Sequence, residues 1–327
     1  MRFLVRQLLV AVVGLAVVLN LDFFLPRLLP GNAADVLAAG YAGVPEQVVR
    51  SITARLGLGQ PLYVQYSLYL QGIFTAFPPD FGVSSTFYPA TAASLVFLRL
   101  PFTLALIAAA FVLATIISYF LAMHSAMKRG RRLEFGSMYA SIVFWATPPF
   151  WLGLLLIWIF GVILKWLPVF GISAFTSSSP SDFLLSVGVH LILPVVTLTA
   201  ATFGFQYLVL RGTYQEVLNT DFVLAAKARG LRGRLIATKY VLRNSMLPLI
   251  SLLGYTISFM VSTAVFVEFV FGYDGVGDLL VDGIIQRDYA ILEAGFFYIA
   301  ALVILLTFIG DILLTRLDPR LQQQGGA

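Results

Sequence analysis

The chain has 327 residues, of which 59% are hydrophobic and only 11% charged, whereas an ordinary soluble domain carries about 25% charged residues. A chain of this composition cannot bury its apolar surface in one water-soluble core, so it must use lipid as part of its solvent. Cysteine is absent and there are only two histidines, which excludes a disulfide framework, a thiolate zinc site and a histidine-based metal cluster.

Six stretches are apolar over about the 20 residues that a helix needs to cross a bilayer. They are continuously apolar rather than alternating, which favours helices over the strands of a closed barrel. The predicted fold class is therefore an all-α polytopic membrane protein with about six transmembrane helices. In chain order the stretches cover residues 3–25, 102–123, 136–164, 187–210, 247–271 and 290–314.

Two of these stretches carry further local signals. Arg2 and Arg6 before an apolar run resemble a signal peptide, but the run is too long and lacks a clean cleavage site, so an uncleaved first span is predicted. The third stretch contains Thr147-Pro148-Pro149 near its middle. Because proline removes a helical hydrogen bond, a kink is expected there.

Lysine and arginine predict the orientation, because they concentrate in cytoplasmic loops. If the N-terminus is cytoplasmic, the successive inside loops hold two, four, seven and two of the 21 basic residues, and the outside loops hold the other six. Both termini are therefore predicted to be cytoplasmic. This topology also explains the net charge of +5, so a nucleic-acid partner is not required.

The spans divide the chain into three parts. Residues 1–25 are the first transmembrane helix, 26–100 an extracytoplasmic segment with many turn signals, and 101–327 a core domain with five further spans. The core includes a long basic cytoplasmic segment, 211–246. A short outside segment, 272–289, is rich in glycine and aspartate.

The basic cytoplasmic segment contains a helix signature. A side-chain oxygen of Thr220 or Asp221 can cap a helix start by accepting a free backbone N–H. Gly230 suits the left-handed residue just past a helix end. The good helix formers between these signals are Ala225, Ala226, Lys227, Ala228 and Arg229.

A second basic helix is predicted from about Arg232 to Asn244, with Pro248 in the first turn of the fifth span, where its missing N–H costs little. The result is a short helix, a tight glycine corner and a second helix in the cytoplasm. Small side chains at Ala225 and Ala226 would let a partner protein approach closely. On composition alone, an ordinary cytoplasmic loop with positive-inside charges is the better explanation of the segment.

The order of residues favours the more specific interpretation. Ala225-Ala226-x3-Gly230 followed by Leu247-Pro248 resembles the cytoplasmic "EAA" signature of binding-protein-dependent ABC transporter permeases. The spacing from Gly230 to Pro248 resembles the dipeptide/oligopeptide/nickel permease family, and within it the first-permease, or B-type, subunit. The glutamate of the signature is Leu224 here, and peptide-type permeases often lack that glutamate.

Shorter motifs extend this resemblance over nearly the whole chain, except for residues 86–100 and 165–186. Each motif alone is weak, but their order and spacing together are specific. They are Pro30-Gly31-Asn32, Leu56-Gly57-Leu58 with Pro61 and Gln65-Tyr66, Asp80 to Ser84, Thr147-Pro148 with Phe150-Trp151, His190 to Pro194, Phe271 to Gly277, Arg287-Asp288-Tyr289 and Asp318-Pro319-Arg320.

The resemblance implies a type I ABC importer permease fold in the cytoplasmic (inner) membrane. It implies a second homologous permease subunit, two ATP-binding subunits and an extracytoplasmic substrate-binding protein as partners. Peptides are the implied substrates, with oligosaccharides or nickel chelates as the family's alternatives. The implied ATPase-coupling residues are Asp221, Ala225, Ala226, Lys227, Ala228, Arg229 and Gly230.

Several catalytic motifs are missing from the sequence. No lysine follows a glycine, so there is no P-loop, and we expect ATP and Mg²⁺ to bind to partner subunits rather than to this chain. There is no G-x-S-x-G or H-E-x-x-H motif either. The chain is therefore expected to be a transport subunit without a cofactor, a metal or an enzymatic activity of its own.

Ionisable residues inside membrane spans are functional candidates by default. Asp22, Glu268, Glu293 and Asp311 lie within or near span ends, where an interfacial position or structural pairing is the simpler interpretation. Glu268, near the outer end of the fifth span, is the strongest candidate for a pathway or gate role, together with Gly275 and Gly277 in the acidic segment. An ion-coupled secondary transporter or a membrane scaffold would be the alternative classes, but midplane charges and inverted repeats are weak here.

The predicted topology can be tested with single cysteines in this cysteine-free chain. Cysteines at Ser84 and Ser178 should react with an impermeant thiol reagent applied outside the cell, because both sites lie in predicted outside segments. A cysteine at Arg232 should react only after the membrane is permeabilised. Labelling of Arg232→Cys in intact cells would reverse the orientation.

Overall fold

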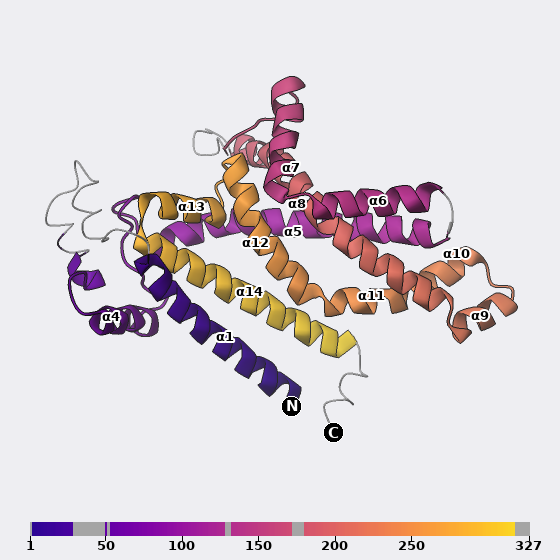
Figure 1. The fold of residues 1–327 in the computed structure, drawn as a ribbon, viewed down its shortest axis with the longest axis horizontal. Helices are drawn as coiled ribbons and strands as arrows, with labels where there is room; N and C mark the ends of the chain where they lie inside the picture. The colour runs from indigo at the N-terminus through magenta and orange to yellow at the C-terminus, as the bar shows by residue number, and fades with distance from the viewer. Residues whose placement is uncertain (1, 29–49, 51–52, 128–131, 172–179, 318–327) are drawn as a thin grey trace. The chain divides into compact units, whose positions relative to one another are not determined.

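The structure is a computed structural model that describes residues 2–28, 50, 53–127, 132–171 and 180–317, and these residues are mostly helical (Figure 1). An isolated bridge pairs Val83 with Thr91. The first helices are α1 (Arg2–Arg27), α4 (Leu62–Thr75), α5 (Ala92–Met127), α6 (Arg132–Ala146), α7 (Pro149–Leu156) and the π-helix η1 (Ile157–Ile163). The later ones are α8 (Pro180–Leu218), α9 (Asp221–Ala228), α10 (Gly233–Leu235), the π-helix η3 (Ile236–Val241), α11 (Leu242–Ser251), α12 (Leu253–Phe271), α13 (Val276–Gln286) and α14 (Tyr289–Leu317).

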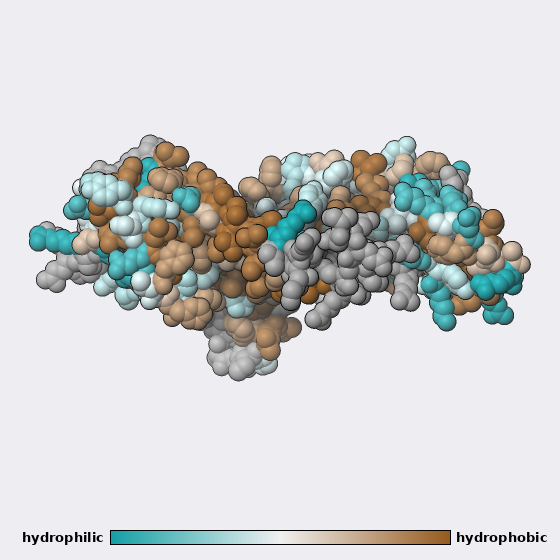
Figure 2. Space-filling model, turned by 90° about the horizontal axis from the view of Figure 1, so that it is seen from below, coloured by the Kyte–Doolittle hydropathy of each residue, from teal (hydrophilic) through white to brown (hydrophobic). Residues whose placement is uncertain are grey.

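The helices confirm the predicted fold class. Five of them are long and apolar enough to cross a membrane, and one bent pair is a sixth candidate. Hydrophobic residues cover much of the face seen in Figure 2, while hydrophilic residues gather at the end that carries α9 and α10. The five continuous candidates are Arg6–Arg27, Ala92–Ala126, Ser181–Leu218, Leu253–Phe271 and Tyr289–Ile312. The orientation of the termini stays a prediction.

The third stretch is interrupted where a kink was expected. The interruption is a full break rather than a bend within one helix. Helices α6 and α7 meet at a bend of 104°, so the stretch forms two separate helices. Pro148 and Pro149 cannot donate backbone hydrogen bonds to the preceding turn, which ends α6 at Ala146. Pro149 then occupies the first position of α7, where a missing N–H is tolerated.

The chain forms two compact units, which we describe separately. Unit 1 contains residues 1–6, 105–273 and 305–327, and unit 2 contains residues 7–104 and 274–304. The predicted division by membrane side stays a prediction.

Unit 2 is built around aromatic side chains from α1, α4 and α14. Phe23 contacts Tyr69 with ring centroids 5.4 Å apart, and Phe81 contacts Phe297 at 5.3 Å. Two buried carboxylates lie beside this core. The Tyr69 hydroxyl donates to Asp22 Oδ2 at 3.0 Å. The second carboxylate forms an ion pair, Arg27 Nη1 to Glu293 Oε1, at 2.6 Å, so the expectation of structural pairing at these span ends is confirmed for both carboxylates.

Unit 1 packs α5, α6 and α8 closely together. Gly204 of α8 is the point of closest approach, because a Cβ there would overlap the carbonyl oxygen of Ser141 and lie 3.0 Å from Trp145 Cβ. Ser118 Oγ of α5 donates to the carbonyl oxygen of Phe203 at 2.9 Å. Small side chains and hydrogen bonds between helices are the usual means of helix association in lipid.

The structure corrects the predicted position of Pro248. It lies inside α11 rather than in the first turn of the fifth span, which begins at Leu253. The predicted second basic helix begins after Arg232 as expected, but it continues through α10, η3 and α11 to Ser251. The helical run passes Asn244 and continues through Pro248.

The structure also changes the choice of topology reporters. Ser84 is fully buried and donates a hydrogen bond to Asp288 Oδ2 at 2.6 Å, so a cysteine there would be shielded from the reagent. Ser178 lies outside the described residues, as do the Pro30-Gly31-Asn32 and Asp318-Pro319-Arg320 motifs. Phe77 is fully exposed, which makes it the better outside position.

Substitution of Gly204 tests the packing of unit 1. Gly204→Ala should destabilise the protein by about 1–3 kcal/mol, because the methyl group would push α6 and α8 apart. Gly212→Ala is the matched control on the same helix, since a Cβ at Gly212 meets no atom within 4 Å. The control should be neutral or stabilised by up to about 1 kcal/mol through helix propensity. Thermal unfolding of both variants in detergent measures the difference, and equal midpoints would contradict the close-approach explanation.

Candidate functional site

The start of α9 differs in detail from the predicted cap. Thr220 is the N-cap residue by its backbone angles, with φ −79° and ψ 153°. Its hydroxyl donates backwards to the carbonyl oxygen of Val217 at 2.6 Å and does not cap α9. Asp221 is the first helical residue, where its negative charge is favourable beside the positive end of the helix dipole.

The end of α9 agrees with the prediction. Gly230 has φ 73°, the left-handed conformation that glycine adopts at no steric cost. The Gly230 N–H donates to Lys227 O at 2.9 Å and the Leu231 N–H to Ala226 O at 3.3 Å. These two bonds form a Schellman motif, which fixes the direction in which the chain leaves the helix.

The two alanines of the signature face opposite ways. Ala226 is fully buried beside Val223, in a core cluster that includes Ile236, Val241 and Leu249. The expectation that Ala226 presents a small side chain to a partner is therefore wrong: its small size lets α9 pack onto its own chain. Ala225 is exposed and remains available to a partner. The exposed residues of α9 and its corner are Asp221, Phe222, Leu224, Ala225, Lys227, Ala228, Arg229 and Gly230.

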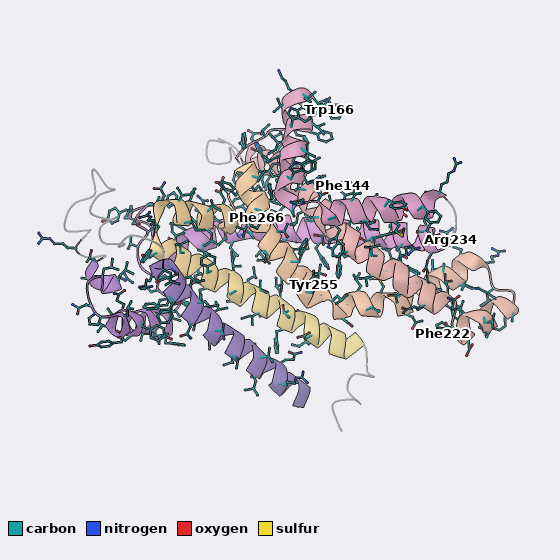
Figure 3. All side chains as sticks on the ribbon, in the orientation of Figure 1. Phe144, Trp166, Phe222, Arg234, Tyr255 and Phe266 are labelled. Carbon is teal, nitrogen blue, oxygen red and sulfur yellow. The ribbon has the colours of Figure 1, made fainter. Side chains whose placement is uncertain are left out.

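Two exposed apolar residues on α9 were missed by the sequence reasoning. Phe222, labelled in Figure 3, is 43% exposed. Leu224 is 65% exposed, although both are large hydrophobic side chains in a basic segment. Large apolar side chains in such positions are typical of surfaces that another protein covers. The signal in the sequence was the apolar residue at the position of the signature's glutamate, Leu224.

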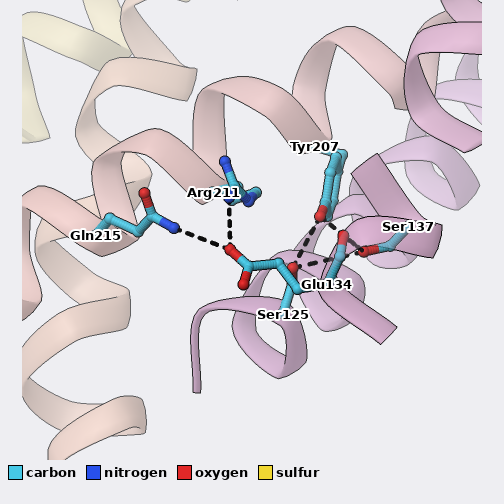
Figure 4. A network of polar contacts seen from close by, with 6 residues as sticks. All are labelled: Ser125, Glu134, Ser137, Tyr207, Arg211 and Gln215. Carbon is cyan, nitrogen blue, oxygen red and sulfur yellow. Dashed lines mark hydrogen bonds and ion pairs between the residues drawn. The ribbon is translucent and has the colours of Figure 1, made fainter. Parts of the chain in front are cut away.

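A polar network supports the helix that carries α9 (Figure 4). Glu134, at the start of α6, accepts hydrogen bonds from two residues of α8: Arg211 Nη2 at 2.5 Å and Gln215 Nε2 at 3.3 Å. The Glu134 and Arg211 side chains are only 5% and 21% exposed, so the ion pair is well shielded from water. Charge-assisted bonds of this kind are the stronger ones and hold α6 and α8 in register.

A second part of the network lies next to this ion pair. The Tyr207 hydroxyl of α8 shares hydrogen bonds with Ser125 Oγ at 2.9 Å and Ser137 Oγ at 2.8 Å. Three helices, α5, α6 and α8, are therefore joined at one level of unit 1.

The structure separates the three candidate gate residues. Glu268 belongs to unit 1, where it is fully buried in the last turn of α12, and its carbonyl oxygen accepts the Tyr273 N–H at 2.8 Å. Gly275 is the N-cap of α13 and Gly277 is buried within α13, both in unit 2. Most of the acidic segment 272–289 is therefore helix α13. A gate role for these three residues stays a prediction.

Helix α13 is tied to the rest of unit 2 by carboxylates. Asp278 pairs with Arg99 of α5 at 3.2 Å. Just after α13, Asp288 Oδ2 accepts the Ser84 hydroxyl at 2.6 Å and the Thr86 N–H at 2.9 Å. These contacts hold the predicted outside segment 26–100 against the start of α14.

Burial raises the pKa of Asp278 from its usual 3.8 to about 6. The neighbouring carboxylates Asp282 and Asp274 add to this rise, and the Arg99 guanidinium opposes it. Among the described residues, no three His, Asp or Glu side chains are close enough together to hold a metal ion.

Comparisons with known proteins identify the family. Residues 114–323 match the family described as the binding-protein-dependent transport system inner membrane component, and residues 1–107 match its N-terminal membrane component. The chain belongs to this family and is a multi-pass protein of the inner membrane, as the sequence predicted.

Three relatives illustrate the similarity. The chain is 32% identical to the di/tripeptide transport system permease protein DppB of Pseudomonas aeruginosa, with 99% of each chain covered. It is 31% identical to the oligopeptide transport system permease protein OppB of Haemophilus influenzae, over 98% of this chain and 99% of the relative. It is 30% identical to the glutathione transport system permease protein GsiC of Escherichia coli, again over 98% and 99%.

The raised pKa of Asp278 predicts a pH dependence of stability. Because the folded-state pKa of about 6 lies above the usual 3.8, Asp278 favours folding while it is protonated. Its contribution should be complete below the usual pKa and should be lost as the pH rises through the folded-state pKa. Thermal unfolding across this range should therefore show wild-type protein losing stability relative to Asp278→Asn as the pH increases. Parallel pH profiles for the two proteins would contradict the prediction.

Proposed function

We propose that this chain forms, with a second homologous permease, the translocation pathway of an ATP-driven importer for peptides. The single observation that carries the proposal is the similarity over the full length to permeases named for peptide or glutathione transport. An extracytoplasmic binding protein would deliver the peptide. Oligosaccharides, nickel chelates and ion-coupled transport remain the alternatives, but none of the relatives described above is named for them.

The exposed surface of α9 supports an ATPase as the cytoplasmic partner. Phe222 and Leu224 supply apolar contact area, and Lys227 and Arg229 supply charge at its edge. The Schellman corner at Gly230 and the buried Ala226 fix this surface to unit 1. Closure of two ATP-binding subunits would push on α9, and the network around Glu134 and Arg211 would carry the movement into α6 and α8.

Reconstitution tests the proposed function. Proteoliposomes that contain both permeases, both ATPases and the binding protein should accumulate labelled di- and tripeptides only when ATP is present. An oligosaccharide and a nickel chelate serve as competing substrates in the same assay. Uptake of peptide without ATP, or uptake driven by an ion gradient, would contradict the importer, and preferential uptake of a competitor would contradict the peptide substrate.

The coupling surface predicts the effect of one substitution on α9. Leu224→Asp should weaken binding of the ATPase subunits by about tenfold or more, because it places a charge in the apolar centre of the contact. The fold should survive, since Leu224 is 65% exposed. Co-purification and substrate-stimulated ATP hydrolysis measure the loss. Tyr63→Asp, at a 75% exposed position of α4 on the predicted outer side, is the control and should leave both unchanged.

A further inference from the structure

The broken third span carries an unusual concentration of tryptophan. All four tryptophans of the chain lie between residues 145 and 166. They are Trp145, Trp151, Trp158 and Trp166, and they are 46%, 50%, 57% and 69% exposed. Figure 3 shows Trp166 at the far end of the arm that begins with α7. Within the described residues none of their indole N–H groups donates a hydrogen bond.

One face of α7 packs against the rest of unit 1, and the other face is exposed. At Gly153 a Cβ would lie 3.1 Å from Phe271 of α12 and 3.6 Å from Thr197 of α8, so this face packs against unit 1. Trp151 lies two residues before Gly153, on about the opposite face, and is 50% exposed, while Phe150 lies nearer the packed face and is 48% exposed. Because α7 packs against unit 1 through Gly153, the position of its exposed face is also fixed.

A groove lies at the break itself. Its volume is about 530 Å³, within the range of about 300–1,000 Å³ that is usual for small-molecule sites. No charged residue lines it. The lining residues are Val143, Ala146, Thr147, Pro148, Phe150 and Trp151.

The break also leaves two backbone acceptors in the turn before it without their helical donors. Pro148 and Pro149 have no N–H, so the carbonyl oxygens of Phe144 and Trp145 lack the donors that a continuous helix would give them. Counted from Arg132, the break lies about 22 Å along α6, which places it within the hydrocarbon if α6 starts at the membrane surface. Irregular backbone at that depth must be covered by protein or line a polar cavity, because lipid tails offer no hydrogen bonds.

We infer that this groove contacts the peptide during translocation, an inference that rests on the proposed function. Trp151 lines the groove and carries an indole donor, and the carbonyl acceptors belong to the turn that adjoins it. Together they match the C=O and N–H groups that every peptide backbone carries. Aromatic and apolar walls accept side chains of different shapes. An uncharged groove holds a peptide without selecting its sequence, which suits a pathway whose specificity lies in a separate binding protein.

Photo-crosslinking in the complete reconstituted importer tests this assignment. The probe is the tripeptide alanine–photo-leucine–alanine, delivered by the binding protein in the presence of ATP. We expect adducts within residues 143–151, located by mass spectrometry and suppressed by excess unlabelled tripeptide. Adducts confined to other segments, with normal uptake, would overturn the inference alone. If the wild-type importer neither transports nor crosslinks the tripeptide, the proposed function fails and this inference fails with it.

Two variants test whether the groove holds peptide rather than lipid or the second permease. Val143→Trp fills the groove and should lower both uptake and crosslinking by about tenfold or more, with normal recovery of the second permease. The matched control is Ile142→Trp, at an adjacent position that is 42% exposed and does not line the groove. Its uptake and crosslinking should stay within about twofold of the wild-type values.

Trp151→Phe keeps the aromatic surface and removes only the indole N–H. It should raise the KM for the tripeptide about three- to tenfold, as expected for one lost hydrogen bond. Normal uptake by Val143→Trp would mean that the groove faces lipid, and loss of the second permease from that variant would mean that it is a subunit interface. Either result would overturn the inference.

Discussion

The constraint on which the structure depends is that a polypeptide in hydrocarbon must satisfy its own backbone hydrogen bonds. The long apolar helices α1, α5, α8, α12 and α14 meet it along most of their length, with exceptions at Pro26, Pro101 and Pro194. At the closest approaches in unit 1 the side chains are small or hydroxylic, such as Gly204 and Ser118, so that backbones come close and polar groups find partners. Where the constraint is relaxed, at the break between α6 and α7, the chain carries its concentration of exposed tryptophans.

Charged residues near the spans follow the same logic. Buried carboxylates are costly unless they are paired, and Glu293 and Glu134 each meet an arginine from another helix. Asp22 meets a tyrosine hydroxyl. These pairs connect helices that are distant in sequence, so they serve as joints between elements. A transported ion is not needed to explain them.

The segment that carries α9, predicted to be cytoplasmic, is also held by packing. Helix α9 is short and would not be stable alone. Its position is held by a buried alanine, a glycine corner and a helical run from Gly233 to Ser251. The exposed Phe222 and Leu224 therefore lie on a segment that is fixed to unit 1.

The sequence by itself determined the features that depend on local chemistry. Apolar length predicted the spans, Pro148 and Pro149 predicted the break, and Gly230 predicted the left-handed corner, because each follows from the covalent properties of a few adjacent residues. The family resemblance followed from the order and spacing of short motifs, and the comparisons confirmed it.

Only the tertiary structure decided which way each side chain faces and which distant residues meet. Ala225 and Ala226 are identical neighbours in sequence, yet one is exposed and the other is fully buried, because packing of α9 on unit 1 selects a single face. The partners of Asp22 and Glu134, at Tyr69 and Arg211, lie 47 and 77 residues away. Helix α13 and the position of Pro248 inside α11 were likewise missed. No local pattern encodes these features, since they depend on how long helices pack against one another across the chain.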